Sequence, residues 1–456
     1  MAYITTYPYT NEVLKEYKSM SDEDVEAALD KAGKLYQSWK NKPVTSRKYY
    51  LENVADLMLN NCDSLAKTIV KDMGKLYTEA VAEVKLSASI AKYYAENGEK
   101  FLSPKPLLTS AGNSWVENNP VGIVMCVEPW NFPYYQLMRV FATNFMAGNP
   151  VMVKHASNCP GCALAFEKII KESGAPEAAY QNLFVSHEQI ANIIADKRVQ
   201  GVALTGSEKA GTHIAAEAGK NLKKSTMELG GNDVMVILDD VDIKKAAKLA
   251  AYARLWNAGQ VCVSSKRYIV EQRIADKFMT ALKAEFAKYQ PGDPMDENTT
   301  LAPLSSKGAQ TNLDQQVKNA VKNGAKIEYG GGILDMQGDF YNPTILSNIS
   351  KDNPAYYEEF FGPVAQFYVA KDDADAIRIA NDSNYGLGGS IVAKDHERAS
   401  KMASKIDTGM VFVNGITQVA YPELPFGGIK RSGYGRELGP DGIKSFVNQK
   451  LISITK

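Results

Sequence analysis

The sequence predicts an α/β protein with two doubly wound lobes and a small β arm. Short apolar segments alternate with helical segments between residues 121 and 238, and the alternation resumes after residue 246. This pattern is typical of a parallel sheet with helices on both faces. A stretch rich in proline and turn residues, 103–120, predicts a projecting hairpin, and a tail that ends in an alternating pattern, 442–456, predicts a terminal strand.

The first hundred residues are predicted to be mostly helical. Residues 22–41 place apolar side chains at helical spacing, including Val25, Leu29 and Leu35, and similar patterns continue to about residue 97. The prolines and turn residues of 103–120 then favour a hairpin that projects from the domain rather than a core strand.

From Val121 onward the pattern changes to strands and helices. The predicted strands of the first unit are 121–127, 150–154, 182–185, 199–205 and 233–238. In the second unit, the predicted helices are 246–259 and 273–289, and the predicted strands are 363–370, 389–393 and 409–414. Ligands of such sheets bind beyond the carboxyl ends of the strands, so the loops that follow strands are the expected functional sites.

Length and composition narrow the functional classes. A chain of 456 residues is expected to form two or three domains. Its 52 Lys and Arg balance 52 Asp and Glu without a long basic run, so neither composition nor patterning favours a nucleic-acid partner. The apolar run 121–127 is far shorter than the roughly 20 residues of a membrane span, so no membrane association is expected. Five sparse cysteines and an N-terminus without a signal sequence predict a cytoplasmic protein.

Cys262 lies in the small, polar stretch "NAGQVCVSS", residues 257–265. Cysteine is usually buried, so its place in a flexible loop raises two alternatives: an idle thiol or a nucleophile. Gly259 and Gln260 permit close approach of a ligand, and the Cys262 amide can face an oxyanion. The loop alone does not decide between these alternatives.

Two other loops carry groups that suit acyl chemistry. Asn131 lies between two prolines in "EPWNFP", which fix the backbone and hold its side-chain amide as a donor for an oxyanion. The alternative is an ordinary turn. Glu228 ends a strand before two glycines in "MELGGND", where a desolvated carboxylate can act as a general base. Its alternative is a solvated acid at a strand end.

The phosphate-binding signals differ from the usual dinucleotide fingerprint, because no G-x-G-x-x-G follows a strand. Instead, residues 205–207, "TGS", connect a strand to a helix whose free amides suit a pyrophosphate. Lys154 and Ser157 follow another strand and offer a cation and a hydroxyl. The alternative for this segment is that Ser157 or Asn158 caps the helix ahead of Pro160.

Two other features are predicted to be structural. Cys159 and Cys162 form a C-x-x-C pair without a thioredoxin-like context. The four histidines are scattered and lack metal-ligand spacing, so no catalytic metal is expected.

In this order, the motifs resemble those of the aldehyde dehydrogenase superfamily along essentially the whole chain. The matching segments are PWNFP, VKHAS, TGS, MELGGND, GQVC, YEEFFGPV, NYGLGGSI and PFGGIKRSGYGRELG. Within the superfamily the chain looks most like the bacterial succinate-semialdehyde dehydrogenases. The resemblance implies two Rossmann-like lobes, with a cofactor-binding domain at 1–100 and 120–229, a catalytic domain at 230–430, and an oligomerisation arm at 101–119 and 440–456. It also implies a homodimer or a homotetramer.

The resemblance assigns roles to individual residues. Cys262 is expected to attack the aldehyde, Asn131 and the Cys262 amide to hold the oxyanion, and Glu228 to activate water. The expected cofactor-binding residues are Lys154, Ser157, Trp130, Gly206, Ser207, Glu359 and Phe361. Glu359 and Phe361 are expected to place the nicotinamide ribose and ring.

Departures from the family pattern refine these expectations. Members that prefer NAD commonly carry a glutamate at the position of Ser157, so its absence predicts NADP as the preferred cofactor, with NAD also accepted. Ser264 replaces a second cysteine that some relatives carry, so no local disulfide switch is expected. Arg139 is expected to bind a distal substrate carboxylate; its alternative is an ion pair across an interface. Trp256 replaces another arginine, and Tyr135, Trp256 and Tyr421 are expected to line the substrate tunnel.

The sequence therefore predicts NADP-preferring oxidation of succinic semialdehyde to succinate through a thiohemiacetal and a thioester on Cys262. The alternatives are another small anionic or aliphatic aldehyde, such as glyceraldehyde-3-phosphate oxidised without phosphate, a non-catalytic structural relative, and a C-x-x-C redox protein.

Overall fold

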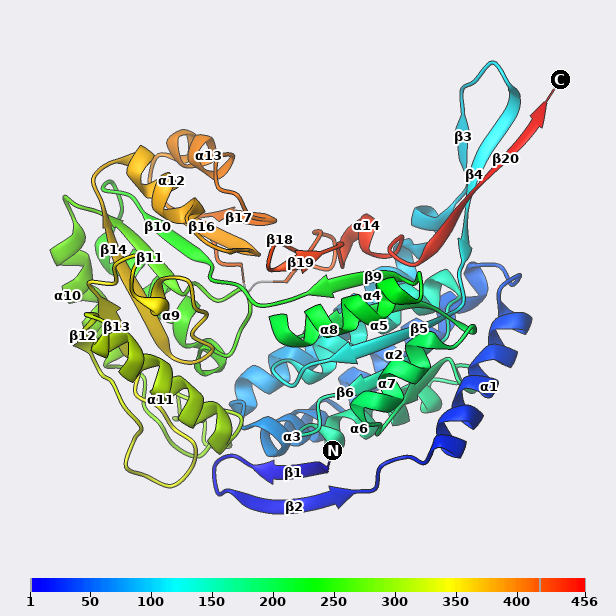
Figure 1. Cartoon of the computed structure of the whole chain (residues 1–456), viewed down its shortest axis with the longest axis horizontal. Coiled ribbons are helices and arrows are strands. Elements are labelled where there is room, and N and C mark those ends of the chain that lie inside the picture. Colours follow the sequence, from blue (N-terminus) through cyan, green and yellow to red (C-terminus); the bar gives the residue numbers. More distant parts are fainter. Residues whose placement is uncertain (1, 418–419, 456) are drawn as a thin grey trace.

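The computed structural model of the protein describes residues 2–417 and 420–455, which form two α/β lobes and a projecting β arm (Figure 1). The first lobe contains a six-stranded sheet in the order β19-β9-β8-β5-β6-β7, in which only β19 is antiparallel to its neighbour. Its strands are β5 (Ile123–Glu128), β6 (Val151–His155), β7 (Tyr180–Asn182), β8 (Val199–Thr205), β9 (Lys224–Glu228) and β19 (Gly433–Tyr434). Its helices are α5 (Pro133–Ala147), α6 (Pro160–Glu172), α7 (His187–Ala195) and α8 (Glu208–Lys220).

The second lobe contains a seven-stranded sheet in the order β12-β13-β14-β11-β10-β16-β17. All neighbours are parallel except β12 and β13. Its strands are β10 (Val234–Ile237), β11 (Arg267–Glu271), β12 (Lys326–Tyr329), β13 (Thr344–Ser347), β14 (Val364–Ala370), β16 (Gly388–Val392) and β17 (Met410–Val413). Its helices are α9 (Ile243–Leu255), α10 (Ala275–Phe286), α11 (Lys307–Lys322), α12 (Asp373–Asn381) and α13 (His396–Ala403).

Local chemistry explains where these elements begin and end. The central strands β5, β6, β8 and β10 are rich in buried Val, Ile and Met because helices cover both faces of each sheet. Ser186 forms a capping box at the start of α7, and Asp242 accepts backbone N–H groups at the start of α9. Gly148 ends α5 in the left-handed conformation, with φ of 97°.

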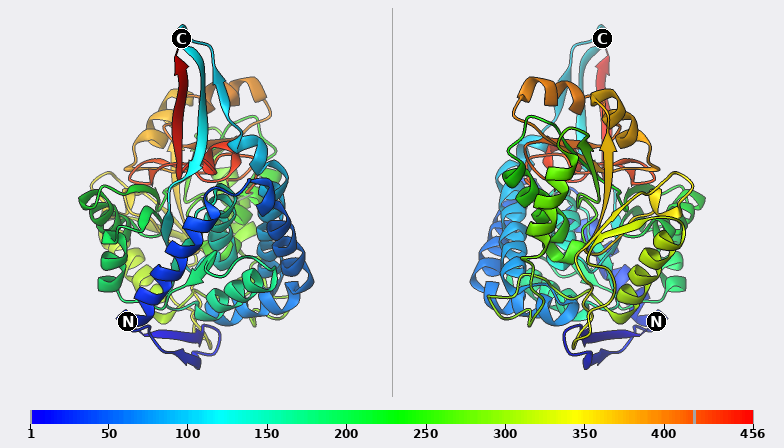
Figure 2. Two further views of the ribbon diagram at one scale, coloured as in Figure 1. Left: turned by 90° about the vertical axis from the view of Figure 1, so that its right-hand side faces the viewer. Right: turned by 90° about the vertical axis from the view of Figure 1, so that its left-hand side faces the viewer.

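The N-terminal segment covers the first lobe and connects it to the second. Helices α1 (Asp22–Trp39), α2 (Thr45–Asn60), α3 (Cys62–Met73) and α4 (Tyr77–Leu102) follow a hairpin made of β1 (Tyr3–Tyr7) and β2 (Glu12–Tyr17). Tyr3 donates a hydrogen bond to Val185 O in the first lobe, and Asp339 N–H in the second lobe donates to Pro8 O. The hairpin therefore bridges the two lobes at the end of the molecule opposite the arm (Figures 1 and 2).

The arm is a three-stranded antiparallel sheet in the order β20-β4-β3. It consists of β3 (Lys105–Leu107), β4 (Gly112–Pro120) and β20 (Val447–Thr455), and β20 pairs with β4 from Val447↔Pro120 to Thr455↔Gly112. The predicted hairpin at 103–120 and the predicted tail strand are thus confirmed. The short strands β15 (Tyr385–Gly386) and β18 (Ile429–Lys430) pair with each other, and the chain continues from β18 through β19 and the short helix α14 (Gly439–Gly442) to β20.

Three details differ from the sequence prediction. The strand expected at 182–185 lies at 180–182, because Leu183–Val185 continue as irregular buried backbone. The helix expected at 246–259 ends at Leu255, where a left-handed turn begins. The β1–β2 hairpin was not predicted, because the exposed side chains of β2 show no buried alternation. Among the described residues, no helix is long and apolar enough to cross a membrane.

Candidate active site

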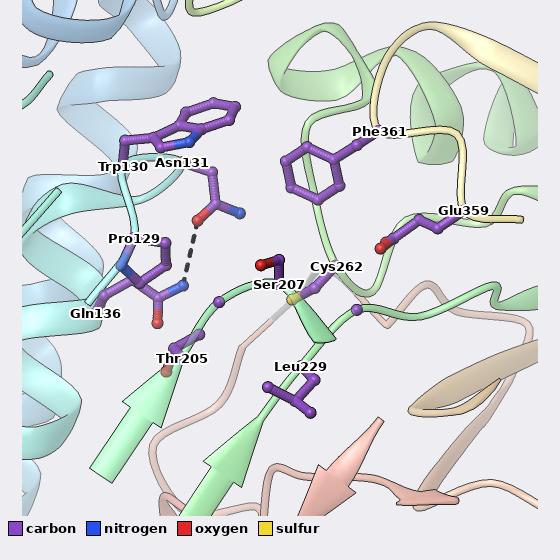
Figure 3. A pocket seen from close by; sticks show the side chains of 12 residues that line it. Pro129, Trp130, Asn131, Gln136, Thr205, Ser207, Leu229, Cys262, Glu359 and Phe361 are labelled. Carbon is purple, nitrogen blue, oxygen red and sulfur yellow. Dashed lines mark hydrogen bonds between the residues drawn. The ribbon is translucent and has the colours of Figure 1, made fainter. Parts of the chain in front are cut away.

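A cavity of about 290 Å³ lies where loops from both lobes meet (Figure 3). The first lobe contributes the loops after β5, β8 and β9, and the second lobe contributes the Cys262 loop and the loop before β14. The lining residues are Pro129, Trp130, Asn131, Gln136, Thr205, Gly206, Ser207, Leu229, Gly230, Cys262, Glu359 and Phe361. The structure thus brings together seven residues that the sequence singled out. The carboxyl ends of β5, β8 and β9 all point to this cavity, as expected for a parallel sheet.

The Cys262 loop begins with an unusual backbone turn. Asn257, Ala258 and Gly259 all have positive φ, of 51°, 51° and 73°. This conformation is costly for alanine, so the surrounding contacts must hold it. The Asn257 N–H donates to Glu79 Oε1 at 3.1 Å, and Asn257 Nδ2 donates to Asn131 O at 3.1 Å. The turn is therefore fixed by contacts to the first lobe.

Cys262 is partly exposed in the cavity. Burial raises the pKa of its thiol to about 12, although the nearby cations of Lys266 and Arg139 lower it. Lys266 Nζ donates to Cys262 O at 2.7 Å and to Val261 O at 2.9 Å, and it pairs with Glu359 at 3.1 Å. The resting group is therefore a thiol, and Lys266 ties its loop to Glu359 on the other side of the cavity.

Asn131 is held as a donor. Its Nδ2 donates to Gln260 O at 3.1 Å, and its Oδ1 accepts from Gln136 Nε2 at 3.4 Å, which fixes the amide orientation (Figure 3). An amide nitrogen carries two hydrogens, so the second N–H of Asn131 is left for an oxygen atom in the cavity. Trp130 and Phe361 lie nearby with their ring planes at 90° and centroids 5.7 Å apart.

Glu228 is only 2% exposed, so the alternative of a solvated acid is wrong. Neither carboxylate oxygen has a hydrogen-bond partner among the described residues. Burial, together with the charge of Glu437, raises the pKa of Glu228 well above its ordinary value, while Arg139 opposes the shift. Glu228 immediately precedes Leu229 in the cavity wall, although its own side chain is not among the lining groups. The arrangement places a buried carboxyl group with a raised pKa, and without a hydrogen-bond partner among the described residues, next to the cavity wall.

Arg139 is buried, with 1% exposure, and lies outside the cavity lining. Its Nε pairs with Glu437 Oε2 at 2.8 Å, and its Nη2 donates to Thr205 Oγ1 at 3.2 Å. The guanidinium also lies 4.8 Å from the Tyr135 ring centroid and 4.6 Å from that of Phe426. An ion pair within its own chain therefore holds Arg139, and its role toward a substrate carboxylate stays a prediction.

The other predicted substrate residues are dispersed. Tyr135 is buried against Arg139, and Trp256 packs against Phe132 with centroids 5.1 Å apart. Trp256 lines a separate cavity of about 570 Å³. Tyr421, which is 44% exposed, lines another separate cavity, of about 200 Å³. The structure does not place these three side chains on the Cys262 cavity.

Another cavity, of about 550 Å³, is lined mainly by residues of α7 and α8. Ser207 lines both this cavity and the Cys262 cavity, and Lys154 lines this one. The full lining is Val127, Lys154, His187, Ile190, Leu204, Ser207, Lys209, Ala210, His213 and Ile214, a set without an acidic side chain. Such a lining suits a phosphorylated ligand.

Ser157 is three residues after Lys154 in the sequence but does not line this cavity. Its side chain makes no hydrogen bond to the described residues. Helix α6 begins at Pro160 with Cys159 as its N-cap residue, and no side chain caps it. The alternative that Ser157 or Asn158 caps this helix is therefore wrong. By contrast, Ser207 does cap α8, because its Oγ accepts the Ala210 N–H at 3.3 Å.

All five cysteines are free. Cys159 and Cys162 are fully buried, and burial raises the pKa of both thiols well above the ordinary value. The Cys162 amide donates to Asp72 Oδ2 at 2.8 Å. The C-x-x-C pair thus lies in a closed interior, as a structural role requires. Within residues 2–417 and 420–455, no group of three His, Cys, Asp or Glu side chains is placed to hold a metal ion.

Sequence reasoning missed the buried cations that position these loops. Besides Lys266, Arg254 is fully buried and donates to Gly259 O at 3.1 Å and to Phe360 O at 2.8 Å, with further bonds to Ser264 and Gly362. It therefore ties the Cys262 loop to the loop that carries Glu359 and Phe361. The sequence shows only a basic residue within the predicted helix 246–259, and the partners Phe360 and Gly362 are 106 and 108 residues away.

Comparison with known proteins gives consistent matches. The model of the aldehyde dehydrogenase family matches residues 2–452. The chain is 43% identical over 450 residues to the succinate-semialdehyde dehydrogenase (NADP⁺) of Deinococcus radiodurans, which covers 99% of this chain and 94% of the relative. It is 50% identical to the succinic semialdehyde dehydrogenase of Streptococcus pyogenes, whose crystal structure with NADP⁺ superposes over 100% of both chains with a TM-score of 0.98. A betaine aldehyde dehydrogenase structure from Staphylococcus aureus is 28% identical, with a TM-score of 0.96 over 100% of this chain and 94% of the other.

Proposed function

The chain belongs to the aldehyde dehydrogenase family, and we propose that it oxidises succinic semialdehyde to succinate with NADP⁺ preferred over NAD⁺. The observation that carries this proposal is the shared cavity of Cys262 and Asn131, faced by Glu359 and Phe361. A thiol beside an oriented amide donor is the arrangement that addition to an aldehyde needs. The names of the relatives in Deinococcus and Streptococcus support the choice of aldehyde and cofactor.

In the first half-reaction, the Cys262 thiol gives its proton to a water molecule, and the sulfur of the resulting thiolate bonds to the aldehyde carbon. The carbonyl oxygen becomes an oxyanion, which accepts hydrogen bonds from the second N–H of Asn131 and from the Cys262 amide. NADP⁺, when bound, would accept the hydride that the aldehyde carbon loses. Loss of hydride regenerates a C=O bond, and the product held on Cys262 is a thioester.

In the second half-reaction, Glu228 removes a proton from water, and the resulting hydroxide adds to the thioester carbon. The raised pKa of Glu228 makes its carboxylate a stronger base than an exposed glutamate, although a smaller fraction is ionised at neutral pH. The same donors hold the second oxyanion. Its collapse breaks the C–S bond, so the sulfur leaves with the electron pair and succinate is released.

Lys154, Ser157, Gly206 and Ser207 are proposed to hold the phosphorylated end of the cofactor. The fit rests on the 550 Å³ cavity, whose lining offers Lys154 and no carboxylate to repel a 2′-phosphate. Ser157 adds a hydroxyl that no helix uses as a cap. Trp130, Glu359 and Phe361 are proposed to border the nicotinamide end, because all three line the Cys262 cavity.

The finer organisation is also a proposal. We assign residues 1–100 and 120–229 to cofactor binding, 230–430 to catalysis, and 101–119 with 440–456 to an oligomerisation arm.

Strand β20 is an edge strand of the arm, and β17 is an edge strand of the second sheet. Such edges expose unpaired backbone groups, so pairing of β20 with β17 of a second copy would cover both in a homodimer or homotetramer. A cytoplasmic location is proposed from the five free thiols.

The test is a set of initial rates for succinic semialdehyde, glyceraldehyde-3-phosphate and butanal, each with NADP⁺ and NAD⁺. The expected result is a kcat/KM for succinic semialdehyde with NADP⁺ at least about tenfold above every other combination. A higher kcat/KM for another aldehyde would make that aldehyde the substrate in place of succinic semialdehyde. A higher kcat/KM with NAD⁺ would overturn the cofactor preference.

A further inference from the structure

The segment at the start of α4 carries three charged residues that touch both halves of the active site. Lys75 precedes the helix, and Glu79 and Glu83 lie in its first two turns. The two glutamates are four residues apart, so they occupy one face of α4. That face is turned toward the Asn131 loop and the left-handed turn before Cys262.

Glu83 holds the start of α5. Its Oε1 accepts the N–H groups of Tyr134 at 2.9 Å and Tyr135 at 3.3 Å, and its Oε2 pairs with Lys75 Nζ. These amides belong to the first turn of α5, where a negative charge also interacts favourably with the helix dipole. Because α5 begins two residues after Asn131, Glu83 fixes the backbone from which Asn131 projects.

Lys75 holds the Asn131 backbone itself. Its Nζ donates to Asn131 O at 2.8 Å and lies 3.6 Å from the ring centroid of Phe132. The side chains of Lys75 and Glu83 are both 0% exposed. Buried ion pairs contribute little net stability compared with apolar groups of the same size, so this pair calls for an explanation other than stability.

Glu79 holds the Cys262 side. Its Oε1 accepts the N–H of Asn257, the first residue of the left-handed turn, and Asn257 Nδ2 in turn donates to Asn131 O. Asn131 O therefore receives hydrogen bonds from both Lys75 and Asn257. One face of α4 thus determines the relative positions of two loops that belong to different lobes.

We propose that Lys75, Glu79 and Glu83 are positioning residues, a clamp that sets the Asn131 amide at the correct place relative to the Cys262 sulfur. The inference rests on the proposed function, because Asn131 and Cys262 take their roles from it. Displacement of reacting groups by about 1 Å can cost roughly a hundredfold in rate, so such a clamp acts on kcat. None of the three side chains lines the Cys262 cavity, so they act through the two loops rather than on the substrate.

The Asn131 side of the clamp is tested with the double variant Lys75→Met/Glu83→Gln. Glutamine keeps an oxygen for the α5 amides, and methionine removes the donor to Asn131 O without leaving an unpaired buried charge. We expect kcat to fall about 10- to 100-fold, while KM and NADP⁺ affinity, measured by protein fluorescence, change less than about threefold. In an Asn131→Ala background the same double substitution should cause little further loss. An unchanged kcat, or an equal loss in both backgrounds, would show that the pair serves folding alone.

The Cys262 side is tested with Glu79→Ala and Glu79→Gln, with Glu96→Ala on the same helix as an exposed control. Glutamine still accepts the Asn257 N–H, so it should restore both kcat and the rate of Cys262 alkylation by iodoacetamide. Alanine should change each by at least about fivefold, and Glu96→Ala should change neither. Equal rates for all three variants would overturn the clamp at Glu79.

The alkylation rate separates failure of the clamp from failure of the proposed function. An inactive wild-type enzyme, or a fully active Cys262→Ser variant, would end the proposed function. Iodoacetamide would still report whether Glu79 controls the Cys262 loop.

Discussion

The Cys262 cavity and the Lys154 cavity, which share Ser207 in their linings, are formed by different parts of the molecule. The Cys262 cavity depends on loops from both lobes, and it is tied together by buried groups such as Lys266, Arg254 and Asn257. The Lys154 cavity is formed by first-lobe elements alone, β5, β6, α7, β8 and α8. Its polar groups at His187, Lys209 and His213 are exposed.

This difference separates the expected effects of substitution. At the Cys262 cavity, burial raises the pKa values of Cys262 and of the neighbouring Glu228, and the Asn131 and Cys262 loops are hydrogen-bonded to each other across the two lobes. Changes there should act on kcat. The Lys154 cavity is proposed to bind the phosphorylated end of the cofactor, so changes there should act on affinity and cofactor choice.

The largest effect is expected from Cys262→Ser. A serine hydroxyl is a much weaker nucleophile in this site, so kcat should fall by at least about a thousandfold while NADP⁺ affinity stays within about twofold. Steady-state rates and fluorescence titration measure the two quantities. Mass spectrometry of the wild type mixed with substrate should find the acyl group on Cys262, and its appearance on another side chain would contradict the scheme.

In the loop that follows β6 and Lys154, Ser157→Glu should reverse the cofactor preference. The new carboxylate would repel a 2′-phosphate and could accept hydrogen bonds from the ribose hydroxyls of NAD⁺. The ratio of kcat/KM for NADP⁺ to that for NAD⁺ should fall about 10- to 100-fold, and kcat itself should change little. Ser157→Ala is the matched control, with a change of only a few-fold. A ratio that stays the same in the glutamate variant would remove Ser157 from the cofactor site.

The pH dependence should also distinguish the cavities. The pKa values of Cys262 and Glu228 are both raised, so both groups are protonated at low pH and the active forms increase as pH rises. Between about pH 6.5 and 8.5, kcat/KM should rise up to about tenfold per pH unit. NADP⁺ affinity should change much less over that range. A rate plateau reached below about pH 7 would contradict a resting thiol at Cys262.

The sequence predicted the reactive groups better than the buried side chains that hold their loops in position. Asn131 and Gly206 lie in short motifs directly after predicted strands, and parallel-sheet geometry brings such loops together. Cys262 follows a predicted helix, and the composition of its loop singled it out. Lys75, Glu79 and Glu83 lie in an ordinary amphipathic helix, and their partners are 51 to 178 residues away. Periodicity places a side chain on a face, but it does not identify what packs there.

Arg139, a predicted substrate-binding residue, is another side chain whose packing partner the sequence does not identify. The sequence places Arg139 eight residues after Asn131, but it does not reveal the buried partner Glu437. If Arg139 also attracts a substrate carboxylate, Arg139→Met/Glu437→Gln should raise KM for succinic semialdehyde about tenfold while KM for butanal stays within about twofold. The double variant avoids an unpaired acid beside Glu128 and Glu228. Equal changes for both aldehydes would leave Arg139 with a structural role only.

The smallest effect is expected from Cys159→Ala/Cys162→Ala. Both thiols are fully buried at the start of α6, behind the Trp130 loop rather than in the cavity, and burial holds both as thiols. Their removal should change kcat by less than about twofold, because neither sulfur can exchange electrons with a substrate. The lost packing should lower the free energy of unfolding by about 1 to 2 kcal/mol, seen as a lower denaturant midpoint. A large loss of aldehyde oxidation without a loss of stability would favour the redox alternative, and it would remove the contrast between the reactive Cys262 loop and the closed interior around Cys159.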